Sequence, residues 1–144
     1  MVESRPLAGH ASLHQSLQAA TAPQQLWPAQ AFFNGKWEEI QQLHKKHKSS
    51  EYNMEPNVKN SPGTLRDIQT ITWVTMRHFG EGTLQALEDN GFLTEFEHQR
   101  LAGSLTFLWR VRYALHMLSG REEDRLLFDL QREVAELLTV QKDR

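Results

Sequence analysis

The stretch TEFEHQRLAGSLTFLWRVRYALHMLSG, residues 94–120, decides the fold of this chain. Thr94 followed by Glu97 predicts a capping box at the start of a helix, and Gly120 is a residue that commonly follows the end of one. In the second half of the stretch, apolar residues occur on nearly all sides of the helix axis, a pattern typical of a buried helix. We therefore predict one long central helix over about residues 95–118.

Helical patterns also flank this stretch on both sides. All five prolines lie at or before Pro62, so the second half of the chain lacks the residue that most strongly breaks helices. Helical spacing of apolar residues, with start and stop residues, predicts further helices over about 11–22, 62–79, 84–89 and 129–138, and one that begins near Pro28 and ends within HKKHKSS (44–50). No strand alternation or internal repeat competes with this pattern. The sequence predicts an all-α fold, a multi-helix bundle of about five to six helices with one long central helix.

The helix expected over residues 62–79 is amphipathic. Ser61 and Pro62 suggest its N-cap and first helical position, and Gly80 its end. Its apolar face carries Leu65, Ile68, Ile71, Thr72, Met76 and Phe79, whereas Arg66, Thr70 and Arg77 gather on another face. This distribution predicts a helix with a basic side.

Length and composition exclude several classes of protein. A chain of 144 residues is expected to form one domain, and its net charge of −2 gives no overall attraction to nucleic acid or anionic lipid. The absence of cysteine excludes disulfides, thiol catalysis and Cys-based zinc sites. No segment has the length of a membrane span or the pattern of a signal peptide. We expect a cytoplasmic protein that binds neither nucleic acid nor membranes.

The chain lacks sequence motifs for metal binding or catalysis. His44 and His47 lie one helical turn apart, but a metal site needs three or four ligands and the neighbours are lysines. We interpret them as a solvated helix end and expect no metal. Gly80-Glu81-Gly82 follows a helix and is interpreted as a turn, since a dinucleotide loop follows a strand. No catalytic residue is assigned.

Two clusters of charged residues are the candidate functional features. The first lies on the central helix and just after it, and consists of Arg110, Arg112, His116, Arg121, Asp124 and Arg125. Because a buried arginine needs a partner, we interpret this cluster as a network of internal ion pairs. The alternative is that one arginine face meets a phosphate or a neighbouring domain.

The second cluster lies in the segment EPNVKNSPGTLRD, residues 55–67. Its candidate residues are Glu55, Lys59, Ser61, Pro62, Gly63, Arg66 and Asp67. An irregular loop that leads into a helix N-terminus offers free amide donors, which suit either an anion or a docked surface.

The segment of residues 55–67 resembles the Glu-Pro-x-x-Lys-x-Ser-Pro-Gly-Gly-Leu-Arg-Asp stretch of the bacterial PII uridylyltransferase/uridylyl-removing enzymes. Further stretches are similar to sequences of the same family: ESRPLAG (3–9), FFNGKWEEIQQLHKKH (32–47), TWVTMRHFG (72–80), NGFLTEFE (90–97) and, most clearly, LWRVRYALHMLSGREEDRLLFDLQREVA (108–135). The resemblance therefore covers essentially the whole chain. Thr64 departs from it, because the family pattern has a second glycine there.

The resemblance implies an enzyme that uridylylates the PII protein with UTP and Mg²⁺ and removes the group in response to glutamine. That family combines a nucleotidyltransferase domain, a helical segment, an HD hydrolase domain and ACT domains. The transferase signature, a Gly-Ser followed by an Asp-x-Asp pair, does not occur in these residues, and neither does the His-Asp doublet of the hydrolase. We expect no cofactor in this chain and no activity of the chain alone.

These comparisons of motifs lead to one expectation for the chain as a whole. Residues 1–10 are interpreted as a remnant of the end of the nucleotidyltransferase core, and residues 11–144 as a helical accessory domain that positions the transferase and joins it to the HD domain. Its expected partners are those two domains and, through the whole enzyme, PII. Both charged clusters are assigned to packing against the transferase, with nucleotide contact as the alternative for the second.

Two rival functions remain open at this point. One is a free-standing helical module that recognises PII or another regulator through the face of Arg66 and Arg77. The other is a nucleotide-binding enzyme in its own right, which would be protected by UTP against thermal unfolding, an effect that we do not expect. Apolar surfaces left open in the separate chain would also favour a homodimer.

Overall fold

The computed structural model describes residues 4–22, 26–47 and 54–140 of the chain. These residues form six helices: α1 (Ala11–Ala20), α2 (Ala29–His47), α3 (Leu65–Phe79), α4 (Leu84–Asp89), α5 (Glu95–Ser119) and α6 (Phe128–Val140). The described part contains no strand, only an isolated antiparallel bridge between Asn57 and Arg125. The predicted all-α bundle is confirmed.

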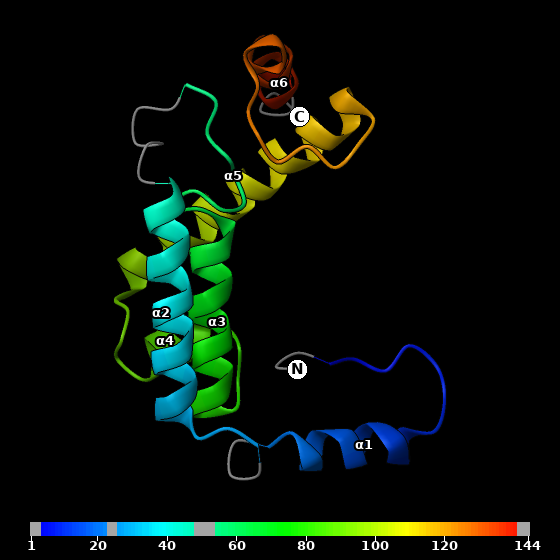
Figure 1. Ribbon diagram of the computed structural model, residues 1–144, viewed down its shortest axis with the longest axis vertical. Helices are drawn as coiled ribbons and strands as arrows, with labels where there is room; N and C mark the ends of the chain where they lie inside the picture. Colours follow the sequence, from blue (N-terminus) through cyan, green and yellow to red (C-terminus); the bar gives the residue numbers. More distant parts are fainter. Residues whose placement is uncertain (1–3, 23–25, 48–53, 141–144) are drawn as a thin grey trace.

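Helix α5 connects the two halves of the molecule. Helices α2 and α3 lie side by side, α4 packs beside α3, and α6 packs against the other end of α5 (Figure 1). α5 contacts α3, α4 and α6, so it is central to the packing as predicted. The expectation that it is buried on nearly all sides is wrong. With partners on only part of its circumference, α5 leaves Phe107, Tyr113 and Met117 each more than half exposed.

Local sequence signals place most helix ends. The Thr94 side chain accepts a hydrogen bond from Glu97 N, and the Glu97 carboxylate accepts one from Thr94 N, so the predicted capping box is present. The backbone N–H and the hydroxyl of Thr94 both donate hydrogen bonds to the Glu97 carboxylate, and these hold the pKa of Glu97 below its usual value. Thr83 caps α4 as predicted. Gly120 follows α5 with a φ of 64°, a left-handed conformation that glycine adopts without strain.

The predicted start of α3 is wrong. The helix begins at Leu65 after an N-cap at Thr64, whereas Ser61 and Pro62 belong to the preceding turn. Gly63 has a φ of 77°, which helical geometry does not allow, and the buried Ser61 hydroxyl accepts a hydrogen bond from Asn57 N instead of capping a helix. Ser61, Pro62 and Gly63, which the sequence pattern assigned to the helix and its cap, therefore form a turn before the helix.

Buried apolar residues lie in both halves of the molecule. Val58 from the loop before α3 packs with Val111, Ala114 and Leu115 of α5 and Val134 of α6, and Leu115 is fully buried. The α2–α3 half buries Phe32, Ile40, Leu65 and Ile68. Helix α1, by contrast, has no buried residue and packs against no other helix.

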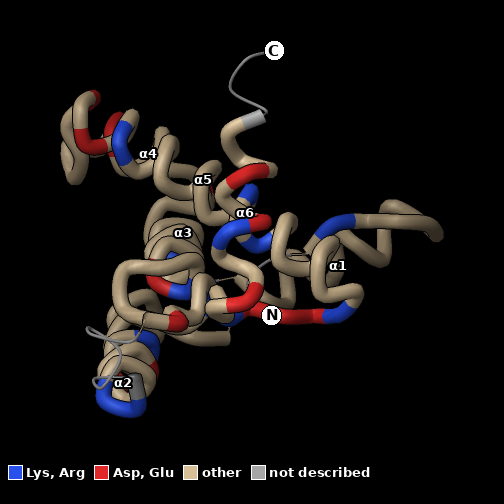
Figure 2. The backbone as a smooth tube through the Cα atoms, turned by 90° about the horizontal axis from the view of Figure 1, so that it is seen from above, with Lys and Arg blue, Asp and Glu red and all other residues tan. Residues whose placement is uncertain are grey.

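Charge is spread over the whole molecule. Basic and acidic residues are interspersed along most of the chain (Figure 2). Within the described residues, no helix combines the length and apolar character that crossing a bilayer requires.

Candidate functional site: a charged clamp around Asp124

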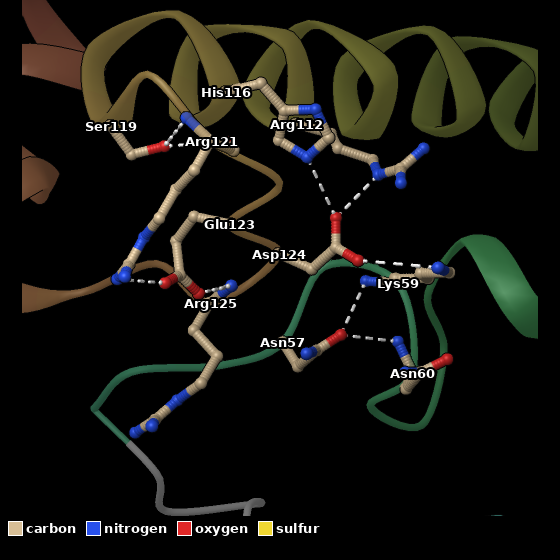
Figure 3. A network of polar contacts seen from close by, with 10 residues as sticks. All are labelled: Asn57, Lys59, Asn60, Arg112, His116, Ser119, Arg121, Glu123, Asp124 and Arg125. Atoms are coloured by element: carbon tan, nitrogen blue, oxygen red, sulfur yellow. Dashed lines mark hydrogen bonds and ion pairs between the residues drawn. The ribbon is translucent and has the colours of Figure 1, made fainter.

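Asp124 lies on the turn between α5 and α6 and carries three basic partners on one carboxylate. Its Oδ1 accepts hydrogen bonds from Arg112 Nε at 2.6 Å and from His116 Nε2 at 3.1 Å, and its Oδ2 lies 3.6 Å from Lys59 Nζ (Figure 3). The Asp124 side chain is 18% exposed. We call Asp124 and these three partners the clamp, because they join α5 to the loop before α3.

Helix geometry and one turn assemble the clamp. Arg112 and His116 are four residues apart, so they lie on the same face of α5. Gly120 then lets the chain reverse, which brings Asp124 back beside that face. Two backbone hydrogen bonds fix the reversed segment against the loop, one from Val58 N to Asp124 O at 2.8 Å and one from Leu126 N to Pro56 O at 2.9 Å.

The loop side of the clamp is shaped by Asn57. Its side-chain oxygen accepts hydrogen bonds from Lys59 N at 3.0 Å and Asn60 N at 2.7 Å (Figure 3). This local turn is typical of asparagine, and it presents Lys59 toward Asp124. Asn57 was not among the residues predicted from the sequence, although asparagine is a residue that commonly forms such turns.

A second, more exposed pair extends the contact between the two segments. Glu55 accepts a hydrogen bond from Arg125 Nη2 at 2.9 Å and another from Phe128 N at 3.0 Å, and so reaches the first turn of α6. Arg121 pairs with Glu123 at 3.0 Å, and its side chain is largely exposed. The two predicted clusters thus meet through Glu55, Lys59, Arg112, Asp124 and Arg125.

The electrostatics of the clamp favour an ionised aspartate. Burial opposes the charge of Asp124, but hydrogen bonds from Arg112 and His116, with the positive charges of Arg112 and Lys59, outweigh it and lower its pKa. A carboxylate held in this way is a poor proton donor or acceptor near neutral pH. The clamp is therefore suited to holding segments together or to binding an anion, and not to acid–base catalysis.

The remaining predicted site residues lie outside the clamp. Asp67 accepts hydrogen bonds from Gly63 N at 2.7 Å and contacts His44 Nε2 at 3.0 Å, which ties α3 to α2. Arg66 donates to Gln69 on its own helix, and Arg110 donates to Leu138 O of α6. Pro62 and Gly63 are exposed in the turn.

Arg66 and Arg77 lie on the same side of α3 as predicted, but Arg77 is buried, so the interpretation of this side as an exposed basic face is wrong. Arg77 is only 7% exposed, and its guanidinium donates hydrogen bonds to Trp27 O and Thr21 O, both at 2.8 Å. It also lies 5.8 Å from the centre of the Phe32 ring. The physical reason is that backbone carbonyls at the α1–α2 junction, which no sequence pattern marks, provide the acceptors that allow this cation to be buried.

The described residues offer no cluster of three or more His, Asp or Glu side chains that could hold a metal ion. Of the two histidines considered for such a site, His44 contacts Asp67, and the side chain of His47 lies outside the described residues.

The fold and its clamp define a helical domain in which charged side chains join segments far apart in the sequence. A comparison with sequence models of protein families matches residues 31–144 to the GlnD PII-uridylyltransferase family. The chain belongs to this family.

Three relatives are bifunctional uridylyltransferase/uridylyl-removing enzymes. Those of Azotobacter vinelandii (strain DJ / ATCC BAA-1303) and Stutzerimonas stutzeri (strain A1501) are each 54% identical over 138 residues, which is 96% of this chain and 15% of the relative. That of Ectopseudomonas mendocina (strain ymp) is 53% identical over 141 residues, 98% of this chain and 16% of the relative. The chain thus spans about one sixth of the length of these relatives. No solved structure matches it.

Proposed function

We propose that residues 11–144 form a helical accessory domain of a bifunctional PII uridylyltransferase/uridylyl-removing enzyme. In this proposal the domain positions the nucleotidyltransferase domain and links it to the HD domain, and residues 1–10 belong to the end of the transferase core. UTP-dependent uridylylation of PII with Mg²⁺, and removal of the group, belong to the whole enzyme. The 144-residue chain is inactive alone.

The observation that supports this proposal is the composition of the clamp. It joins residues of the two segments that most closely resemble the family, 55–67 and 108–135, yet its one carboxylate is fully engaged by cations. Catalysis of nucleotidyl transfer requires carboxylates free to hold Mg²⁺. A clamp of this kind instead gives a rigid scaffold.

Exposed apolar surfaces support docking against other domains. Phe107, Tyr113 and Met117 are exposed along α5, and a hollow of about 370 Å³ between α2 and α3 includes Trp37 and Ile71. Such surfaces are typical of a domain that packs against neighbours.

Rigidity is the physical basis of a positioning role. A displacement of about 1 Å between reacting groups can lower a rate about a hundredfold. Because Arg112 joins α5 to Asp124 and through it to the loop before α3, its loss would shift one half of the domain relative to the other. The transferase domain docked on these surfaces would then be misplaced.

The test places the substitution equivalent to Arg112→Ala in the full-length Azotobacter vinelandii relative. We expect uridylylation to fall at least about tenfold, since the reacting groups lose their register. Arg132→Ala is the matched control, because Arg132 lies on α6 with its side chain 89% exposed. Wild-type rates in a normally folded Arg112→Ala enzyme would contradict the positioning role, as would the same result for Arg66→Ala.

The structure does not provide the surface through which a free-standing module was expected to recognise PII. It depended on a face shared by Arg66 and Arg77, and Arg77 is buried against the α1–α2 junction. We therefore retain the accessory domain as the proposed function.

A further inference from the structure

A concave basic surface lies beside the clamp, between the loop before α3, the first two turns of α3 and the middle of α5. Its volume is about 480 Å³, within the range of small-molecule sites. We call it the basic hollow. Its lining residues are Lys59, Leu65, Arg66, Ile68, Gln69, Thr72, Leu105, Trp109 and Arg112.

The basic hollow carries a local excess of positive charge. Lys59, Arg66 and Arg112 line it together, and no acidic residue is among its lining residues. Asp124 neutralises at most one of these three charges, through its contacts with Lys59 and Arg112. The whole chain has a net charge of −2, so this excess is local and not a consequence of composition.

The three cations retain hydrogen-bond donors beyond their contacts within the protein. The bond from Arg112 to Asp124 uses Nε, and the two terminal nitrogens extend away from the carboxylate (Figure 3). Arg66 uses Nη1 for Gln69, and a guanidinium has five N–H donors in all. Lys59 Nζ is 3.6 Å from Asp124 Oδ2, longer than a hydrogen bond.

The floor of the basic hollow strengthens electrostatic attraction. Leu65 and Ile68 are buried beneath it, and the Arg112 guanidinium lies 5.4 Å from the centre of the Trp109 ring. Apolar walls lower the effective dielectric constant, so a charge bound there interacts more strongly than in open solvent. Trp109 is 51% exposed, and its ring offers a flat surface beside the cations.

We propose that the basic hollow binds a phosphate-bearing anion. Two arginines and a lysine converge from three different elements, which matches an anion with several charges and several acceptor oxygens. Guanidinium groups bind phosphate through paired hydrogen bonds, and lysine adds a point charge. This inference goes beyond the proposed function and differs from the expectation, drawn from the sequence, that UTP does not protect the chain alone.

Titration calorimetry of the 144-residue chain with pyrophosphate tests the proposal directly. We expect saturable binding that Arg66→Gln weakens at least about tenfold, because a hydrogen-bonded charge is lost while the clamp stays intact. Arg132→Gln removes the same charge from an exposed position on α6 and should leave the affinity unchanged. Thermal unfolding of both variants checks that they are folded.

Two further ligands identify which part of a nucleotide is bound. UTP should bind at least as tightly as pyrophosphate and quench Trp109 fluorescence, whereas uridine, without phosphate, should not bind. The proposal is overturned if pyrophosphate does not bind, if Arg132→Gln weakens binding as much as Arg66→Gln, or if uridine binds as well as UTP. It is also overturned if an acidic peptide displaces pyrophosphate at lower concentration, since the hollow would then be a protein-docking site.

The outcome is independent of the positioning role. Failure of binding leaves the activity test with Arg112→Ala in the full-length relative unaffected. Conversely, binding by the separate chain would persist even if that activity test gave wild-type rates.

Discussion

The clamp and the α1–α2 junction satisfy basic side chains in opposite ways. In the clamp, Lys59, Arg112 and His116 share the carboxylate of Asp124, and backbone hydrogen bonds reinforce the contact. At the junction, Arg77 is more deeply buried, and its described acceptors are two backbone carbonyls. One region neutralises charge with charge, and the other surrounds a single cation with peptide dipoles.

This difference determines which residue each region depends on. Removing the acid from the clamp leaves three basic groups without their common partner. At the junction, the carbonyls are part of the backbone, so only the arginine can be removed, and its loss leaves two acceptors without a donor. The junction also carries α1, which packs against no other helix and depends on this attachment.

The largest effect is expected for Asp124→Asn. The amide keeps the shape of the side chain but removes the charge beside Arg112, whose side chain is only 20% exposed. Breaking a largely buried ion pair by removing one partner costs about 3 kcal/mol. Urea denaturation should therefore show a loss of about that size in the free energy of unfolding.

Asp89→Asn is the matched control for this change. Asp89 ends α4 in an exposed position and accepts a hydrogen bond from Gln85 on its own helix, so its replacement should cost less than about 0.5 kcal/mol. Equal stability of the Asp124→Asn and Asp89→Asn proteins would mean that the clamp does not hold the two segments together.

A smaller effect is expected for Arg77→Met. Methionine fills similar space but leaves Thr21 O and Trp27 O without their donor, at a cost of about 2 kcal/mol. Limited proteolysis should also cut between α1 and α2 sooner, because the attachment of α1 is lost. If Arg77→Met is no less stable than Arg132→Met, an exposed control, the buried arginine contributes nothing to the junction.

The fold was predictable because its signals are local. Caps at Thr83 and Thr94, the glycines after α3 and α5 and the absence of proline beyond residue 62 specify where helices begin and end. The turn at Ser61 misled the prediction, because a Ser-Pro pair suits both a helix start and a tight turn. The φ of Gly63 decides between them, and it depends on contacts of the folded chain.

The charged site was predictable only in part. Arg112, His116 and Asp124 are close in sequence, so their pairing could be anticipated from helix spacing and the following turn. All of α3, α4 and α5 lie between Lys59 and Asp124 in the sequence, and only the fold brings these two residues together. The burial of Arg77 could not be anticipated, since its acceptors are backbone carbonyls that exist in every sequence.

The exposed Glu55–Arg125 pair should contribute less to stability than the clamp. Glu55→Gln removes the charge that faces Arg125, whose side chain is 52% exposed, and weakens the acceptor for Phe128 N. We expect a loss of about 1 kcal/mol, because solvent screens this pair. Glu136→Gln, in the exposed pair with Arg132, is the control. A loss as large as that of Asp124→Asn would place the main attachment at Glu55.

The smallest effect is expected in the acid dependence of stability. Because the pKa of Asp124 is lower in the folded protein, its contribution is complete above its unfolded pKa of about 3.9 and is lost as pH falls through the folded value. The difference in unfolding free energy between wild type and Asp124→Asn should therefore narrow between about pH 5 and pH 3. Glu97, whose pKa is also lowered, is common to both proteins and cancels in this difference. A difference that stays constant over this range would show that the carboxylate charge does not stabilise the clamp.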